Sequence, residues 1–353
     1  MTDLMASRRA LLLGGAGLAT ALAMPHVARA AGGSITVMGF FGIFEDNYTK
    51  AVIEPFMRAN PEIKVGFRPV RGSAEATAML RTQRSRPSND VVIMDIAIAA
   101  QNNRDGLFAP LDPAKVPNLA NIPAWGRPAN NMGAAVTQDQ LAILCNPTKL
   151  KKPLASWMDL ADPALSGRLA LPLGDVRGTV LLALLDRAAG ADYKKDVGPG
   201  LAAMKRIAAN AQTFEPQPDV YTAIRSGLVD GGVGWNARAQ LNVDQAKGEF
   251  AAITPAEGTG PQINTVNLVA NTPNAEAAQR FIDYALGEDA QKAFAQALYY
   301  GPTNSKVSLD PALSARIFGS EAARAKQMEL DWDWFAQNNN VLIQRIRREV
   351  IAG

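Results

Sequence analysis

Residues 229–236 contain the side chain best suited to hold a small organic molecule. They run Val-Asp-Gly-Gly-Val-Gly-Trp-Asn, so Trp235 follows a short apolar, glycine-rich stretch. This pattern predicts a strand that ends on a large aromatic ring, with a helix before it and another after it. In open α/β sheets, ligands bind at the carboxyl ends of strands. A core tryptophan that fills the junction is the alternative interpretation.

A second segment has the chemistry of an anion site. Residues 174–179 run Gly-Asp-Val-Arg-Gly-Thr and precede the apolar helix predicted at Val180–Leu185. The free N–H groups at the start of a helix, with Arg177 beside them, can bind a carboxylate or a phosphate. An ordinary loop with Thr179 as a capping residue explains the same pattern.

The scarcity of histidine and cysteine excludes several kinds of chemistry. The chain has one histidine, His26, and one cysteine, Cys145. His26 lies in the predicted leader, so the mature chain lacks the residues for a Ser-His-Asp triad, a Cys-His dyad or a zinc site of the usual kind. No two acids are spaced convincingly for a carboxylate mechanism. We therefore predict a binding protein that is not an enzyme and needs no cofactor.

The first thirty residues have the pattern of an export signal. Arg8 and Arg9 form a twin-arginine pair before an apolar run from Leu11 to Met24, and residues 28–30 form an A-x-A cleavage site. We expect cleavage after Ala30 and a periplasmic location. The run is too short and too rich in glycine and alanine for a good membrane anchor. Without the leader the net charge is about +1, which gives no case for nucleic acid or acidic membranes.

The remaining residues, 31–353, are too many for one ordinary core and predict two α/β lobes. Strands at 34–38, 63–67 and 91–94 alternate with helices at 44–58 and 73–84, an order that favours a parallel, doubly wound sheet. Phe41 and Asp95 then lie at the carboxyl ends of strands. We place the first crossing between lobes at 141–144 and the second at 263–269. The last forty residues are expected to pack back on the first lobe.

The order of several motifs resembles one family. Gly-Leu-Phe-Ala-Pro-Leu-Asp at 106–112, Ser-Trp-Met-Asp-Leu at 156–160, Gly-Trp-Asn at 234–236, Tyr-Gly-Pro-Thr-Asn at 300–304 and Asp-Trp-Asp at 331–333 are similar to those of the solute-binding proteins of ABC importers. The branch named for spermidine and putrescine is the most similar. The resemblance implies a two-lobed periplasmic-binding-protein fold with a hinge and an interlobe cleft.

The resemblance also implies domain boundaries, partners and a site. Lobe 1 comprises 31–144 and 268–353, and lobe 2 comprises 145–267. The partners are a small molecule and an ABC permease of the inner membrane, with no nucleic acid and no insertion into the membrane after cleavage, and the protein is expected to be a monomer. The candidate ligand-binding residues are Phe41, Asp95, Asp175, Arg177, Gly178, Thr179, Trp235, Tyr300 and Asp333, with Arg238 nearby.

This sequence departs from the polyamine-binding pattern at two places. Residues 264–266 are Asn-Thr-Val where polyamine binders have a tryptophan and an acid, and Gly178 replaces a glutamate. Because burying arginines beside a polycation is costly, we expect a solute with one ammonium and one anionic end, such as an amino acid or an amino-phosphonate. An arginine then binds the anion, and Asp95 or Asp333 binds the amine.

Two other functions compete with this interpretation. Tyr299 and Tyr300 could contribute phenolates to a ferric-ion site, although adjacent side chains usually diverge. An exported enzyme that works in the same cleft is the other alternative.

Overall fold

The computed structural model describes residues 33–317 and 327–353. The predicted export signal and its cleavage site therefore lie outside the described residues. Within the described part of the chain, every helix is too short or too polar to cross a membrane.

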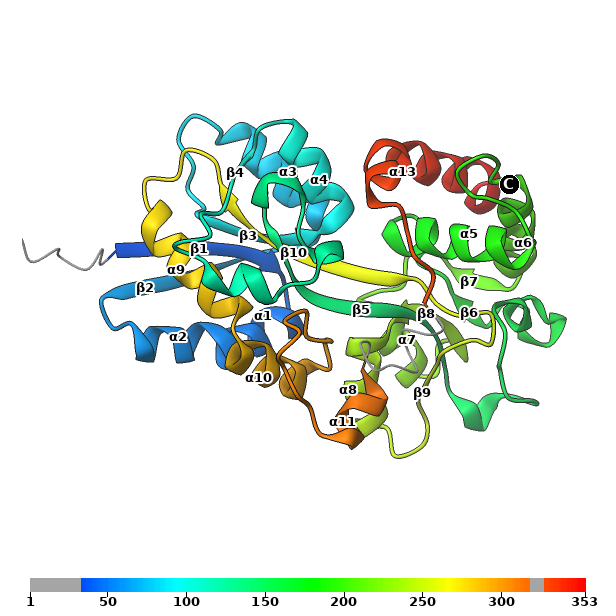
Figure 1. Cartoon of the computed structure of the whole chain (residues 1–353). Coiled ribbons are helices and arrows are strands. Elements are labelled where there is room, and N and C mark those ends of the chain that lie inside the picture. The colour runs from blue at the N-terminus through cyan, green and yellow to red at the C-terminus, as the bar shows by residue number, and fades with distance from the viewer. Residues whose placement is uncertain (1–32, 318–326) are drawn as a thin grey trace, which may run out of the picture. The chain divides into compact units, whose positions relative to one another are not determined.

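Ten strands of the described residues form one ladder in the order β2-β1-β3-β10-β5-β8-β6-β7, with β4 paired to β10 and β9 to β5 (Figure 1). The strands are β1 (Gly33–Phe40), β2 (Ile63–Val70), β3 (Val91–Asp95), β4 (Phe108–Ala109), β5 (Ala134–Cys145), β6 (Leu169–Ala170), β7 (Ala211–Thr213), β8 (Gly231–Trp235), β9 (Ala251–Ile253) and β10 (Pro261–Val269).

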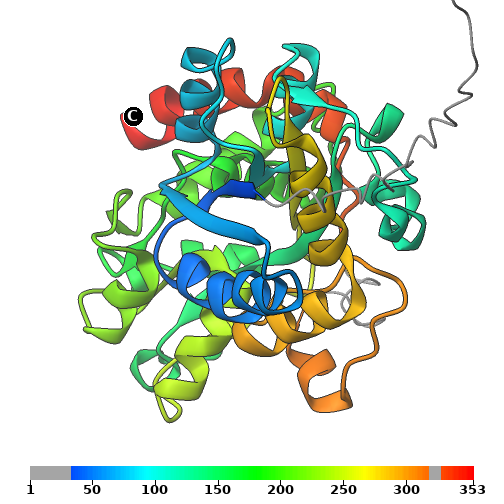
Figure 2. The ribbon, with the colours of Figure 1, turned by 90° about the vertical axis from the view of Figure 1, so that its left-hand side faces the viewer.

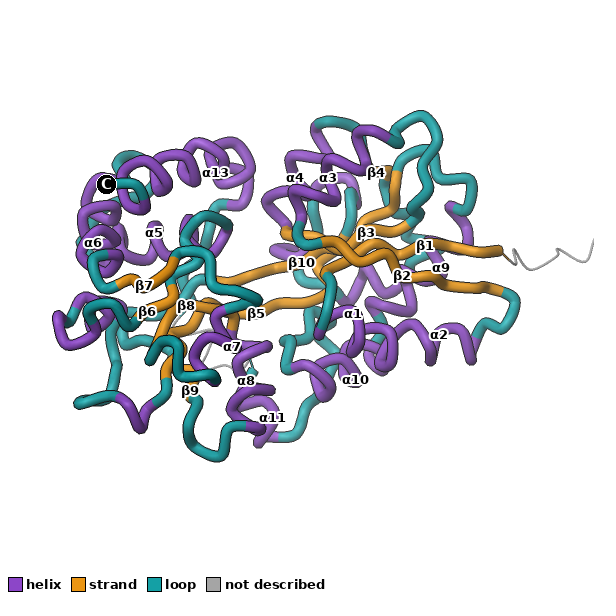
Figure 3. The backbone as a smooth tube through the Cα atoms, turned by 180° about the vertical axis from the view of Figure 1, so that it is seen from behind, coloured by secondary structure: helices purple, strands orange, loops and turns teal. Residues whose placement is uncertain are grey.

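Strand β5 belongs to both halves of this ladder. Its residues up to Gln140 pair antiparallel with β10, whereas those from Leu141 pair antiparallel with β8. All of its side chains are buried. Figure 3 shows β5 and β10 running between the two groups of helices. The chain is thus a two-lobed α/β protein. The first lobe packs around β1, β2, β3 and β10, and the second around β6, β7 and β8.

The first lobe contains the predicted parallel strands. β1 pairs parallel with β2 and β3, and the carboxyl edge of this sheet begins at Phe40 and Asp95. β10 is antiparallel to β3, so the sheet is mixed. Its helices are α1 (Ile43–Tyr48), α2 (Glu54–Ala59), α3 (Ser73–Thr82), α4 (Ile96–Arg104), α9 (Ala275–Leu286) and α10 (Glu288–Leu298). A π-helical turn at Thr49–Ile53 joins α1 to α2. Figure 2 views this lobe from the left-hand side of Figure 1.

The second lobe has its own apolar core. Trp157 is fully buried there, and its indole N–H donates to the Gly258 carbonyl at 3.0 Å. The core also surrounds most of α5, whose residues from Gly178 to Asp186 are all buried. The helices of this lobe are α5 (Val176–Ala188), α6 (Gly198–Ala208), α7 (Val220–Arg225) and α8 (Asn236–Gln245).

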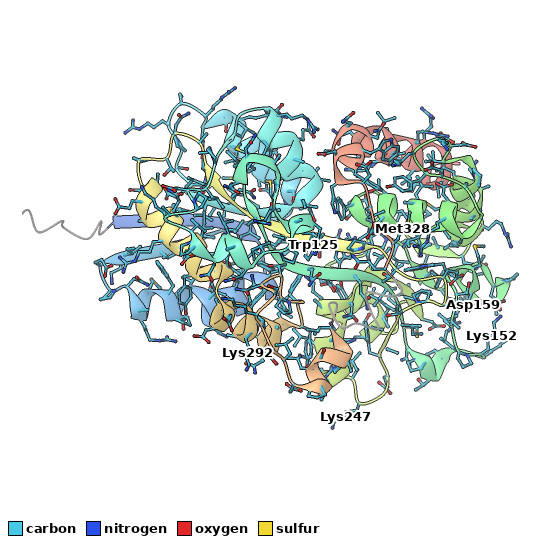
Figure 4. The ribbon with its side chains drawn as sticks, in the orientation of Figure 1. Trp125, Lys152, Asp159, Lys247, Lys292 and Met328 are labelled. Carbon is cyan, nitrogen blue, oxygen red and sulfur yellow. The ribbon has the colours of Figure 1, made fainter. Side chains whose placement is uncertain are left out.

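The end of the chain differs from its predicted place. After the short helix α11 (Pro311–Arg316), the chain reaches Met328, whose N–H donates to the Thr259 carbonyl at 2.8 Å (Figure 4). Helix α13 (Trp332–Ile346) then packs in the second core with α5, and it also contacts α4 of the first lobe. A local sequence pattern does not specify which core receives a helix, and the other domain boundaries remain a prediction.

Candidate functional site

A cleft of about 1120 Å³ contains five of the ten predicted site residues. The first lobe contributes Phe41, Ile43 and Arg71, and the second lobe contributes most of the other lining residues. The predicted residues on the cleft are Phe41, Asp175, Arg177, Trp235 and Arg238. Asp95, Gly178, Thr179, Tyr300 and Asp333 are not among the lining residues.

Trp235 lies on the cleft wall and is anchored in the second core. Its side chain is 9% exposed. Glycines precede it because β8 is closely packed on both sides: a Cβ at Gly232 would lie 2.2 Å from the Ala170 carbonyl oxygen, and one at Gly234 would lie 2.6 Å from Leu144. Strand β8 therefore brings its backbone close to its neighbours and leaves the indole at the end of the strand.

Tyr221 fixes the backbone of Trp235 and also lines the cleft. Its hydroxyl donates to the Trp235 carbonyl at 3.0 Å and accepts from the Trp235 N–H at 2.9 Å. Burial raises the pKa of Tyr221 to about 12, so the phenol stays neutral and can make both bonds. This pair of bonds holds the transition from β8 to α8 in a single geometry.

Asp175 and Arg177 form an ion pair at the start of α5. The Asp175 carboxylate caps the helix by accepting from the Arg177 N–H at 2.9 Å, and it also accepts from the Arg177 guanidinium at 2.5 Å. The Arg177 side chain is 23% exposed and that of Asp175 is 50% exposed. The predicted anion seat is thus partly occupied by the protein's own carboxylate, which also holds the guanidinium in place.

Arg238 follows Trp235 in the first turn of α8. Its Nε is buried and has no hydrogen-bond acceptor among the described residues. The charge of Arg238 acts on Asp139 of β5, but both oxygens of Asp139 accept from the Ala237 N–H at 3.0 Å. Burial raises the pKa of Asp139 to about 8, against the effect of these amides and of Arg238. Asp139 therefore anchors α8 without neutralising Arg238 in an ion pair.

Asp95 ends β3 and is held within the first lobe. Its carboxylate accepts from the Ser73 hydroxyl at 2.6 Å and from the Gln262 amide at 3.3 Å. Burial raises the pKa of Asp95, these hydrogen bonds oppose the rise, and the charge of Asp175 adds to it. The Ser73 hydroxyl, at the start of α3, thus binds Asp95, and α3 has no side-chain cap.

Gly178 and Thr179 have packing roles. A Cβ at Gly178 would lie 1.9 Å from the Leu173 carbonyl oxygen, so no side chain fits there. Thr179 is fully buried, and its hydroxyl donates to Asn339 of α13 at 2.8 Å. The glutamate expected at position 178 is therefore incompatible with this backbone.

Tyr300 and Asp333 also lie off the cleft. Tyr300 is buried in the first core, with its ring stacked 5.4 Å from that of Phe294. Asp333 is exposed in the first turn of α13. The neighbouring Tyr299 donates to Asp244 at 2.5 Å and lies under the Arg316 guanidinium. The two phenols therefore have separate environments, and the described residues contain no cluster of three or more potential His, Cys, Asp or Glu metal ligands.

Several lining residues were not predicted from the sequence. The loop from Thr213 to Asp219 forms part of the wall, as do Arg71, Arg225 and Arg347. A proline-rich stretch that follows one strand and precedes a helix capped by Asp219 is a usable signal for the loop. Arg347 is distant in sequence and enters the site only because α13 packs on the second lobe.

Comparison with known protein families identifies the family of this chain. A family model described as "Bacterial extracellular solute-binding protein" matches residues 51–317. Because this span is most of the chain, the protein belongs to that family. The two-lobed α/β fold is that of periplasmic binding proteins, as predicted.

Two curated relatives and one solved structure illustrate the likeness. A spermidine/putrescine-binding periplasmic protein of Haemophilus influenzae is 24% identical over 267 residues, which cover 71% of this chain and 73% of the relative. A gamma-aminobutyric acid-binding protein of Pseudomonas aeruginosa is 26% identical over 340 residues, 92% of this chain and 93% of the relative. The PBP AgtB from A. tumefaciens R10, in complex with agropinic acid, has a TM-score of 0.77 and 22% identity, covering 90% of this chain and 98% of that one.

Proposed function

We propose that this chain is the extracytoplasmic solute-binding component of an ABC importer, and that its solute carries an ammonium group and an anionic group. The family membership supports the first part. The observation that carries the second is the arginine-lined cleft, with Trp235 on its wall and acids in the minority. A free polyamine would have to approach these arginines with charges of the same sign.

The lining residues suggest a division of roles. Trp235 and Phe41 would cover the apolar part of the solute, and Arg177 and Arg238 would bind its anionic end through charge-assisted hydrogen bonds. Asp95 would receive the amine when the lobes approach each other. We propose that β5 and the segment before β10 act as the hinge, with the solute selecting the closed state.

The wider setting follows from the same proposal. The leader would be cleaved after Ala30, and the mature monomer would work in the periplasm. It would deliver the solute to an inner-membrane ABC permease without making or breaking bonds in it. Neither the lone buried Cys145 nor the separated phenols of Tyr299 and Tyr300 favours an enzyme or a ferric-ion carrier.

Isothermal titration calorimetry of the purified mature protein tests the proposal. We expect heat and thermal stabilisation with zwitterions such as gamma-aminobutyrate, and none with putrescine or spermidine at equal concentration. The variant Trp235→Leu should lose binding. Its matched control is Trp125→Leu, since Trp125 is 45% exposed and does not line the cleft (Figure 4). Tight putrescine binding with no response to zwitterions would refute the proposed solute class.

A further inference from the structure

The cleft has an excess of positive charge. Its lining residues include five arginines and three acids, with no lysine and no histidine. The arginines are Arg71, Arg177, Arg225, Arg238 and Arg347, and the acids are Asp175, Glu215 and Asp219. The lining thus carries two more positive than negative groups. A zwitterion with a single carboxylate would leave part of this charge unmatched.

Two of the five arginines already have carboxylate partners. Arg177 is paired with Asp175, and Arg71 is paired with Glu75 at 3.0 Å on the surface, where its side chain is 85% exposed. The acid Asp219 uses its carboxylate to cap α7, accepting from the Thr222 N–H at 2.7 Å. The charges of Arg177 and Arg71 are thus largely balanced by their partners, whereas Asp219 keeps its negative charge because a neutral amide does not cancel it.

The other three arginines form no ion pair with any described residue. Arg225 donates to the neutral side chain of Gln245 at 2.9 Å, and Arg347 donates to the Gly174 carbonyl at 3.2 Å. Both are exposed, whereas Arg238 is partly buried. These three arginines are therefore available to an anion.

Of these three arginines, Arg238 gives the strongest indication of what the cleft binds. Its Nε is buried without an acceptor among the described residues, while the Asp139 oxygens are committed to the amides of Ala237 and Gln140. A buried donor left unpaired costs about 1–3 kcal/mol. An anion with several oxygens can satisfy it, because a guanidinium binds planar or tetrahedral oxyanions through two parallel bonds.

We infer that the solute carries a doubly charged anionic end, either a phosphonate or phosphate group or two carboxylates, and that Arg238 is the residue that selects it. This inference rests on the proposed function and narrows its substrate class. Arg225 and Arg347, which are exposed and line the cleft, supply the remaining positive charge. Both anion types share the same chemistry, which is two negative charges within reach of one partly buried guanidinium.

Calorimetric titrations of the mature protein with four probes of similar size distinguish a singly charged anionic end, two carboxylates and a phosphonate. Gamma-aminobutyrate has one carboxylate, (2-aminoethyl)malonate adds a second on the same carbon, 3-aminopropylphosphonate replaces the carboxylate with a phosphonate, and putrescine has a second ammonium. We expect one of the two dianionic probes to bind at least about 10-fold more tightly than gamma-aminobutyrate. Which of them does so distinguishes a dicarboxylate from a phosphonate.

Arginine variants test whether Arg238 causes the preference for a dianionic probe over gamma-aminobutyrate. Arg238→Gln should reduce the 10-fold preference to about 2-fold or less while leaving the melting temperature of the free protein unchanged or raised, because it removes a buried unpaired donor. Arg58→Gln is the matched control, since that side chain is 70% exposed and lies away from the cleft. It should keep the preference.

The outcomes separate this inference from the proposed function. Equal binding of gamma-aminobutyrate and both dianions, or failure of both dianions to bind, overturns the inference. If gamma-aminobutyrate binds in either case, the proposed function stands. Binding of putrescine alone overturns both. A preference that persists in Arg238→Gln overturns the assignment to that residue.

Discussion

The two walls of the cleft differ in how firmly their side chains are held. On the first-lobe wall, Phe41 is 51% exposed, and its backbone N–H donates to the Val70 carbonyl at 3.0 Å. On the second-lobe wall, Trp235 is 9% exposed, and both its backbone N–H and its carbonyl are hydrogen-bonded to the Tyr221 hydroxyl. The second wall is therefore preorganised, whereas the first has a large aromatic surface still open to solvent.

This difference suggests an order of binding. A preorganised wall loses little conformational entropy when the solute arrives, so most of the affinity should come from the second lobe. When the first lobe closes over a bound solute, the exposed ring of Phe41 is buried, and this burial stabilises the closed state. We expect substitutions on the second wall to have larger effects than equivalent substitutions on the first.

Replacing the aromatic ring on each wall tests this comparison directly and should give the largest effect. Trp235→Leu should weaken binding about 100-fold, about 3 kcal/mol, because a buried aromatic contact is lost. Phe41→Leu should weaken binding only about 5- to 10-fold. Calorimetry with whichever solute the probe titrations identify measures both. Equal losses in the two variants would refute the preorganised second wall.

Glycine substitutions compare the rigidity of the two lobes near the cleft. Gly178→Ala should lower the free energy of unfolding by about 2–3 kcal/mol, because the added methyl group collides with the Leu173 carbonyl. Gly72→Ala, before α3 in the first lobe, meets nothing within 4 Å and should cost at most about 1 kcal/mol. Urea unfolding measures the difference, and a similar cost at both positions would contradict the expectation.

Removing one oxygen tests the anchor beneath Trp235. Tyr221→Phe deletes the hydroxyl that bonds to both backbone groups of Trp235 and should cost about 2 kcal/mol of stability. Affinity should fall as well, because the indole loses its fixed position. Tyr284→Phe, in the first lobe and away from the cleft, is the control. Unchanged affinity in Tyr221→Phe would show that the indole is positioned by packing alone.

The variant Asp139→Asn tests the anchor of α8 through the pH dependence of stability. With its pKa raised from 3.8 to about 8, Asp139 keeps its proton in the folded protein over a range where the unfolded chain has lost it. Its contribution to stability is complete below about pH 4 and is lost as pH rises to about 8. The wild type should therefore lose more stability between pH 5 and pH 8 than the variant. Parallel slopes in urea unfolding would exclude a role for Asp139.

Much of the fold could be predicted from patterns of adjacent residues. The apolar runs at 34–38, 63–67 and 91–94 correspond to β1, β2 and β3, and the helical stripe at 44–58 corresponds to α1 and α2. These predictions succeed because strand and helix periodicity depend on near neighbours. The end of the chain was expected on the first lobe, whereas α13 packs in the core of the second lobe and also contacts α4 of the first. Local periodicity does not identify the partner of a helix.

The candidate site was predictable only in part. Trp235, Asp175, Arg177, Arg238 and Phe41 all lie on the cleft, and each is at or near a strand end or helix start that the sequence marks. Tyr300 and Asp333 came from the family resemblance alone, and neither is among the residues that line the cleft. Arg71 and Arg347 could not have been found, because neither belongs to a local pattern.

The sequence by itself determined the chemistry that is possible here. With its only histidine inside the predicted leader and a single cysteine, the chain has few of the groups used in nucleophilic or metal chemistry, and its arginines, acids and aromatic rings are the strongest candidates for contact with a solute. Only the tertiary structure decided which of these groups share a cleft and which are already paired. Asp139 occupies the amides of α8 and leaves Arg238 without an ion pair, an arrangement that depends on residues about a hundred positions apart. Composition and periodicity are local properties, whereas the charge of a cleft depends on packing between distant segments.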